Sequence, residues 1–376
     1  MASRPTVMVF APAVLDRVYN AIKARVAGGS AVKRMFFVKG LKAGERNFKK
    51  NVVGAPGLYQ KVVFSKVQEL LGGRVRIMLS GSAPLSPEVQ MFVQTCFNCP
   101  LRQGYGLTET CAATTITSPH DSTPGHCGPP QENACVRLRD WPEGNYYSSD
   151  KDKPEIGMPR GEILIGGPTV TDGYYVPSAW QRPLAALNTP REEAEAERDC
   201  VRRNQSDFMT IGGIRYFCTG DIGQFTPEGT IQLIDRKKDL IKLQQGEYVA
   251  LSKVENVLKS SKYTAIPLVY AHPTKSYCIA LVCPQVPNLK ALASSLGVQS
   301  DSVEAMCKSE EVVAAVLADL QAQCKGNRLA AFEIPQKLIL VADEWSVENS
   351  MLTSTMKIKR KDITSRHMAE IDAVYT

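Results

Sequence analysis

The chain has 376 residues, of which 44% are hydrophobic and 22% are charged. This length exceeds what one hydrophobic core usually supports, so two or three domains are expected, and the composition excludes a disordered chain. The net charge of +7 comes from 45 basic and 38 acidic residues spread along the chain. No block of like charges indicates an arm that binds nucleic acid.

The cysteines, eleven in all, stand at irregular spacings, and the pair Cys96 and Cys99 has no second pair at a zinc-like distance. The four histidines fall in no metal motif. Free thiols in a reducing compartment are therefore expected. The mild basicity suits an anionic small molecule or an anionic membrane surface equally well, so peripheral membrane association stays open. No apolar run reaches the length of about 18 residues that a bilayer-spanning helix needs.

The amino-terminal segment from Thr6 to Leu15 is apolar and follows Arg4, as in a short signal peptide. Pro12 interrupts this run, however, and apolar residues then continue at helical spacing as far as Val26. A short strand that leads into an amphipathic helix is the favoured interpretation.

Residues 75–96 predict a β-loop-α unit, the building block of parallel sheets. Positions 75, 77 and 79 alternate as in a strand, and Ser86 then precedes Pro87 as the N-cap of a helix. The buried face of this helix is expected to consist of Val89, Phe92, Val93 and Cys96. The candidate cofactor-binding turn between them consists of Gly81, Ser82 and Ala83. Small residues let a ligand approach the backbone, and open α/β sheets bind ligands at strand carboxyl ends. Any tight turn would nevertheless look similar.

Residues 126–235 are richer in Gly, Pro and short β-like runs, which indicate a smaller antiparallel sheet or barrel. Within them, residues 178–215 read as a charged, solvated insertion that contains a helix. Beyond Asp235, strands at 266–270 and 277–283 and a helix at about 309–324 indicate a third section.

A second candidate segment runs from Gln103 to Thr110. Gly104 and Gly106 bracket Tyr105, whose ring would be free to stack on a planar base. Thr108 offers a hydroxyl to a phosphate, and Glu109 offers the hard oxygen ligand that Mg²⁺ prefers. A tyrosine in a turn before a capped helix would give the same pattern.

Two later segments complete the set. Asp221 ends the run Thr219-Gly220-Asp221, and its carboxylate could accept hydrogen bonds from both hydroxyls of a ribose. Basic clusters follow at residues 235–239 and 351–360, where a mobile lysine could neutralise charge between a carboxylate and a phosphate. Taken singly, a Thr-Gly-Asp turn is common, and a basic cluster is more often a solvated face.

The order of these motifs is more specific than any one of them. Gly-Tyr-Gly-x-Thr-Glu, Thr-Gly-Asp, Asp-Arg-x-Lys and a late lysine before Ile-x-Arg resemble the adenylate-forming, AMP-binding enzyme superfamily. The sequences at residues 72–76, 234–238, 245–249 and 352–357 are similar to those of long-chain fatty-acid–CoA ligases. The similarity runs from about Arg4 almost to the carboxyl end, apart from the insertion.

This resemblance implies an α/β fold. Residues 1–236 would form the carboxyl-terminal portion of the AMP-binding large domain, with a partial parallel-sheet subdomain and a β-rich subdomain that carries the 178–215 insertion. Residues 237–376 would form a small, mobile α+β domain. The implied reaction is the ATP- and magnesium-dependent activation of a long-chain fatty acid, followed by its transfer to coenzyme A.

The resemblance also implies roles for matching nucleotide-binding positions. Tyr105 would stack on adenine, Thr108 and Glu109 would meet the α-phosphate and Mg²⁺, and Asp221 and Arg236 would hold the ribose.

Four further positions would serve the mobile domain. Lys238 would lie at the hinge of its rotation, and Lys357 would assist formation of the acyl-adenylate. Gly246 and Glu247 would line the path of the pantetheine arm of coenzyme A.

One departure from the family is large. A Thr/Ser/Gly-rich phosphate loop ending in Pro-Lys-Gly does not occur in the 376 residues, so the chain is expected to be an amino-terminally truncated ligase with impaired activity. A sheet cut in this way would leave an unpaired apolar edge. Ser354 also stands where the family tends to have proline.

Three hypotheses follow. The chain is a ligase of long-chain fatty acids, or a non-catalytic relic or interaction protein that retains affinity for AMP or coenzyme A, or a ligase with another acid specificity in the same superfamily. The resemblance implies a cytoplasmic location or the cytoplasmic face of the endoplasmic reticulum.

Overall fold

The computed structural model describes residues 4–83, 85–112, 114–176, 190–298, 300, 302–354 and 356–375. They divide into two compact units, Met1–Leu233 and Ile234–Thr376. A domain boundary after Arg236, with mobility of the second domain, stays a prediction.

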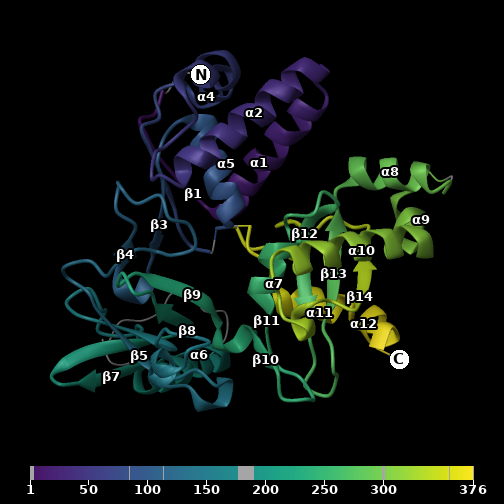
Figure 1. Ribbon diagram of the computed structural model, residues 1–376. Coiled ribbons are helices and arrows are strands. Elements are labelled where there is room, and N and C mark those ends of the chain that lie inside the picture. The colour runs from purple at the N-terminus through teal and green to yellow at the C-terminus, as the bar shows by residue number, and fades with distance from the viewer. Residues whose placement is uncertain are drawn as a thin grey trace. The chain divides into compact units, whose positions relative to one another are not determined.

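The first unit begins with a sheet of strand order β1-β2-β3-β4. Strands β1 (Val7–Phe10), β2 (Ile77–Ser80) and β3 (Leu101–Tyr105) run parallel, and β4 (Thr115–Ile116) is antiparallel to β3. Helices α1, α2 and α5 lie together beside these strands (Figure 1). Their bounds are Pro12–Ala27, Ala31–Phe48 and Pro87–Phe97, and the short segments α3 (Gly57–Tyr59), the π-helical turn Gln60–Phe64 and α4 (Ser65–Gln68) follow α2.

This arrangement confirms the parallel β-loop-α unit and the strand that leads into a helix. Pro12 opens α1 instead of breaking it, because the first helical position needs no N–H. Ser86 holds the N-cap position of α5 as predicted, but its side chain makes no capping hydrogen bond. The predicted inner face of α5 is buried, with Val93 and Cys96 inaccessible to solvent.

An antiparallel sheet of strand order β5-β6-β8-β7, with β9 paired to β8, forms the rest of the first unit. The strands are β5 (Cys135–Arg139), β6 (Arg160–Gly166), β7 (Phe208–Ile211), β8 (Ile214–Phe225) and β9 (Ile231–Arg236). The short β runs at 161–165 and 230–234 therefore belong to β6 and β9. A cluster that includes Tyr105, Ile163, Ile165 and Ile231 forms an apolar core in this region.

Part of the predicted insertion 178–215 lies outside the described residues, which resume at Pro190. Helix α6 (Pro190–Ser206) is largely exposed from residue 195 onward, as a charged surface helix should be. Strand β7 then pairs with β8 in the antiparallel sheet. The end of the segment is therefore part of the folded unit.

The second unit is built on a sheet of order β12-β13-β14. Its elements are β10 (Leu240–Lys242), β11 (Tyr248–Ala250), α7 (Leu251–Leu258), β12 (Thr264–Tyr270), β13 (Ile279–Pro284), α8 (Val286–Ser295), α9 (Val303–Lys308), α10 (Glu310–Gly326), β14 (Lys337–Leu340), α11 (Arg360–Arg366) and α12 (Met368–Tyr375). Alternate residues of β13 supply two cores: Ala280 and Val282 join one, and Ile279 and Leu281 join the other. The sheet is therefore buried on both faces.

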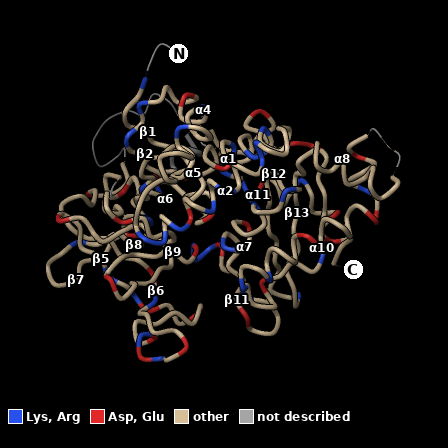
Figure 2. Tube along the Cα trace, turned by 45° about the horizontal axis from the view of Figure 1, so that its top comes forward, with Lys and Arg blue, Asp and Glu red and all other residues tan. Residues whose placement is uncertain are grey.

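Charged residues of both signs are distributed along the traces of both units (Figure 2). All eleven cysteines are free thiols. Within the described ranges, no helix combines the length and the apolar character that crossing a membrane requires.

Candidate nucleotide site

The first two candidate segments lie side by side because they end neighbouring parallel strands. Ser80 of β2 pairs with Gln103 of β3, and a Cβ added to Gly81 would lie 3.5 Å from the carbonyl oxygen of Gly104. Ser82 has a left-handed backbone with φ of 75° and is exposed, as is Ala83. The strand carboxyl ends thus present a short exposed turn.

Gly106 is required by close backbone packing. A Cβ at this position would lie 1.3 Å from the carbonyl oxygen of Ala112 and 3.0 Å from the amide nitrogen of Thr114. No side-chain rotation relieves a contact with backbone atoms. The segment therefore folds back tightly on itself directly after Tyr105.

The segment 103–110 and the Thr-Gly-Asp turn meet through a hydrogen bond between residues 116 positions apart in the sequence. The Tyr105 hydroxyl donates to Oδ2 of Asp221 at 2.7 Å. Tyr105 is 9% exposed and Asp221 is 8% exposed. Burial and the adjacent carboxylate hold the pKa of Tyr105 well above its usual value, so the phenol stays protonated. Stacking of a base on this ring and binding of ribose by Asp221 stay predictions.

The Thr-Gly-Asp turn is anchored to strand β6. The Thr219 hydroxyl donates to the carbonyl of Ile163 at 2.8 Å, and the Gly220 amide donates to Glu162 at 3.2 Å. Glu162 in turn pairs with Arg139 of β5. Because Gly220 has φ of 69°, the chain turns here in a conformation that favours glycine.

Thr108 and Glu109 lie in a single 3-10 turn, Thr108–Thr110. Thr108 is exposed, and the Glu109 side chain is 19% exposed. The Tyr174 hydroxyl donates to Oε1 of Glu109 at 2.6 Å. Sequence patterns did not single out Tyr174, because nothing local relates it to a residue 65 positions earlier.

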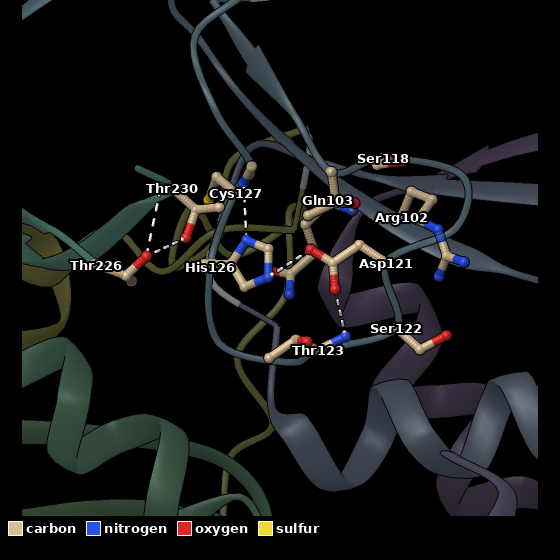
Figure 3. A network of polar contacts seen from close by, with 12 residues as sticks. Arg102, Gln103, Ser118, Asp121, Ser122, Thr123, His126, Cys127, Thr226 and Thr230 are labelled. Carbon is tan, nitrogen blue, oxygen red and sulfur yellow. Dashed lines mark hydrogen bonds and ion pairs between the residues drawn. The ribbon is translucent and has the colours of Figure 1, made fainter. Parts of the chain in front are cut away.

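A buried polar network supports the strand that carries Gly104 and Tyr105 (Figure 3). Nδ1 of His126 accepts a hydrogen bond from the Gly128 amide at 3.0 Å, so Nε2 carries the proton and faces Oδ2 of Asp121 at 3.2 Å. The backbone amide of Gln103 donates to the Thr117 hydroxyl at 2.9 Å. These groups fix the loop that follows β4.

The remaining candidates belong to the second unit. Arg236 and Lys238 are exposed where β9 ends and the 3-10 turn Lys237–Asp239 begins. Asp235, which precedes them in β9, is 8% exposed and accepts hydrogen bonds from the backbone amides of Arg236 and Ser252. Burial raises the pKa of Asp235 to about 7.

Gly246 and Glu247 form the turn between β10 and β11, where Gly246 has φ of 95° and Glu247 is exposed. Lys357 is exposed in a loop closed by two bonds to Thr353.

Arg360, the arginine of the late Lys-Ile-x-Arg motif, forms ion pairs within the second unit. Its guanidinium lies 2.8 Å from Glu255 and 3.4 Å from Asp239. It thereby joins the segment that carries Lys357 to the one that carries Lys238. Both carboxylates raise the pKa of Arg360, although burial opposes them.

The residues fit a magnesium ion that arrives with a nucleotide. The described ranges contain no group of three or more His, Cys, Asp or Glu that could hold a metal. Glu109 offers one partly accessible carboxylate beside the exposed Thr108. Mg²⁺ typically keeps several waters and binds one or two carboxylates together with substrate phosphates, so a single carboxylate suffices.

Known proteins match the chain in sequence and in fold. The AMP-binding enzyme family matches residues 2–175. The chain is 38% identical over its full length to long chain acyl-CoA synthetase 8 of Arabidopsis thaliana and covers 49% of it. It is 32% identical to human long-chain-fatty-acid–CoA ligase 1 over 99% of the chain and 48% of that protein. The chain thus spans about half the length of these relatives.

Among solved structures, the adenylation domain of a carboxylate reductase from Mycobacterium chelonae matches 99% of the chain and 47% of that structure. The TM-score is 0.69 at 26% identity. The corresponding domain from Segniliparus rugosus, solved with AMP and a carboxylic acid, gives 0.67 at 25%. The fold and the motif order are thus those found in AMP-binding, adenylate-forming enzymes.

Within that class, the chain is similar along its whole length to long-chain acyl-CoA synthetases.

Proposed function

We propose that the chain takes part in the ATP-dependent activation of a long-chain fatty acid to an acyl-adenylate and in transfer of the acyl group to coenzyme A. The hydrogen bond between Tyr105 and Asp221 carries this proposal, because it joins two motifs that share no local structure. The similarity to acyl-CoA synthetases and to an adenylation domain solved with AMP supports it.

Each candidate residue has chemistry suited to this reaction. The exposed turn at Gly81, Ser82 and Ala83 would admit the nucleotide to the strand ends. Thr108 would donate to a phosphate oxygen, and Glu109 would hold Mg²⁺, which supplies charge neutralisation at the phosphates. These two residues would therefore orient the phosphate end of the nucleotide.

Asp221 and Arg236 would hold the ribose, and Lys357 would stabilise the charge that develops as the acid attacks the α-phosphate. Lys238 would act at a hinge, and Gly246 and Glu247 would guide coenzyme A. Two relatives are described as peroxisomal; a cytoplasmic location or the cytoplasmic face of the endoplasmic reticulum remains our proposal for this chain.

Replacement of Lys357 tests the mechanism. Lys357→Ala should lower acyl-adenylate formation about 10²- to 10³-fold, the range seen when one preorganised charge-stabilising donor is removed. The measurement is ATP-dependent formation of acyl-adenylate and acyl-CoA by the purified chain. Lys361→Ala is the matched control, because Lys361 is also exposed and lies four residues further on. Full activity of Lys357→Ala would refute the role of this lysine.

A second candidate is an AMP- or CoA-binding protein without turnover. The match of residues 2–175 to the AMP-binding enzyme family fits nucleotide binding alone as well as turnover. Calorimetry that shows AMP binding by a chain with no acyl-CoA synthesis would support this candidate, and robust turnover would eliminate it.

A further inference from the structure

The carboxylate of Glu109 is connected to helix α6 through the Tyr174 side chain and through a direct ion pair, in which Arg203 Nη2 lies 3.9 Å from Glu109 Oε1. The Tyr174 hydroxyl donates to Glu109 Oε1 at 2.6 Å, and Nη2 of Arg203 donates to the Tyr174 hydroxyl oxygen. The Arg203 guanidinium also lies 3.8 Å from the centroid of the Tyr174 ring. Arg203 is thus both a hydrogen-bond donor to this phenol and a cation over its face.

The backbone at Tyr174 is held by the residue next to Arg203. The Tyr174 amide donates to Asn204 Oδ1 at 2.6 Å, and Asn204 Nδ2 donates to the Tyr174 carbonyl at 2.9 Å. At the preceding Gly173, a Cβ would lie 2.6 Å from Asn204 Oδ1. Close packing thus fixes the main chain here.

Two more hydrogen bonds restrain Glu109 and Arg203. The Thr171 amide donates to the carbonyl of Glu109 at 2.9 Å, which attaches the same segment to the Glu109 main chain. The Arg203 Nε donates to Asp207 at 3.2 Å, which orients the guanidinium. Both the main chain and the carboxylate of Glu109 are therefore restrained by residues 171–207.

The direction of the hydrogen bonds is set by charge. A tyrosine phenol is protonated at neutral pH and a carboxylate only accepts, so the Tyr174 hydroxyl is the donor to Glu109. The hydrogen bond that Arg203 donates to the phenol oxygen polarises the O–H group and strengthens the bond that this group donates to Glu109.

We propose that Tyr174 and Arg203 are positioning residues that hold the Glu109 carboxylate in the orientation in which it receives the divalent cation of a metal–nucleotide complex. This inference rests on the proposed function and extends it, since it makes helix α6 a support of the site. Residues that orient a metal ligand typically contribute about 10- to 100-fold to metal affinity.

The test separates metal-dependent from metal-independent binding. The affinity of the full chain for ATP is measured by competition with a fluorescent nucleotide, once with Mg²⁺ and once with EDTA. The ratio of the two dissociation constants is the gain due to the metal. Tyr174→Phe should lower this gain about 10-fold or more while the affinity in EDTA changes less than about twofold.

Matched controls exist for both residues. Tyr175→Phe removes the hydroxyl of the neighbouring, 48% exposed tyrosine and should leave the gain unchanged. Arg203→Ala should lower the gain, whereas Arg202→Ala should not, because the Arg202 side chain is 77% exposed and pairs with Asp199 on its own helix. In a Glu109→Gln background, Tyr174→Phe should have no further effect, because the ligand it positions is gone.

The outcomes are distinguishable. A wild-type chain that binds no ATP under either condition overturns the proposed function and this inference with it. A wild-type gain that Tyr174→Phe retains overturns the inference alone. Equal losses with and without metal in Tyr174→Phe also overturn it, because they show a general structural role. A larger gain in Arg203→Ala refutes positioning by Arg203, since it shows that this cation opposes the metal.

Discussion

At the scale of single residues, the candidate site depends on positions where no side chain, or one particular functional group, is tolerated. Gly106 has no room for a methyl group, and the Tyr105 hydroxyl has a buried carboxylate as its partner. Removal of a partner from such a buried group typically costs about 1–3 kcal/mol. The stability of the first unit and the shape of the candidate site therefore depend on the same contacts of these residues.

Gly106→Ala should destabilise the first unit by about 3 kcal/mol or more, at the upper end of overpacking costs, because the added Cβ meets backbone atoms of Ala112. Gly57→Ala is the control: its Cβ would have no neighbour within 4 Å. Urea unfolding of the two variants should show a lower midpoint for Gly106→Ala only. Equal midpoints would mean that the turn rearranges without cost.

At the scale of elements, helix α7 and strand β9 are joined by a carboxylate whose proton affinity is altered by burial. Asp235 accepts a hydrogen bond from the Ser252 amide in the first turn of α7, yet its pKa is raised to about 7 because desolvation outweighs these bonds. The folded chain therefore binds a proton that the unfolded chain has already released.

Stability should consequently fall as pH rises from about 4 to about 7, by up to about 1.4 kcal/mol per pH unit, and should become constant above the folded pKa. Asp235→Asn removes this titration, so the difference in unfolding free energy between wild type and variant should depend on pH only in that window. Chemical denaturation at several pH values measures it. Asp343→Asn, at a side chain that is 67% exposed, is the control. A pH-independent difference for Asp235→Asn would contradict the raised pKa.

At the scale of the molecule, the first sheet ends in a strand with exposed apolar residues. In the described ranges β1 pairs only with β2, and Val7 and Val9 are 55% and 72% exposed. Unpaired edges of this kind promote association with other chains.

Val9→Lys should reduce concentration-dependent association of the purified chain, and its stability should change by less than about 0.5 kcal/mol. Lysine on an edge strand opposes pairing with another strand through charge and solvation. Sedimentation velocity and light scattering measure the effect. Val201→Lys, at a 42% exposed position on helix α6, serves as the control. Equal association of wild type and Val9→Lys would show that the edge is not the contact.

Much of this protein follows from its sequence, because the signals are local. Strand alternation at 75–79 and the helical spacing through Val93 and Cys96 predicted one strand and one helix, and the motif order resembles that of adenylate-forming enzymes. In the strand, however, the buried residues are Met78 and Ser80, not the alternating positions 77 and 79. Strand neighbours in a parallel sheet then make the proximity of Gly81 and Gly104 foreseeable.

Other features arise only when the chain is folded. No local pattern pairs Tyr105 with Asp221, Glu109 with Tyr174, or Arg203 with either of the latter two, since each contact joins different elements. The missing capping bond at Ser86 also depends on its surroundings. Residue type and spacing determined the chemistry available to this protein, whereas tertiary packing decided which groups meet, because burial and hydrogen-bond partners are properties of the assembled fold.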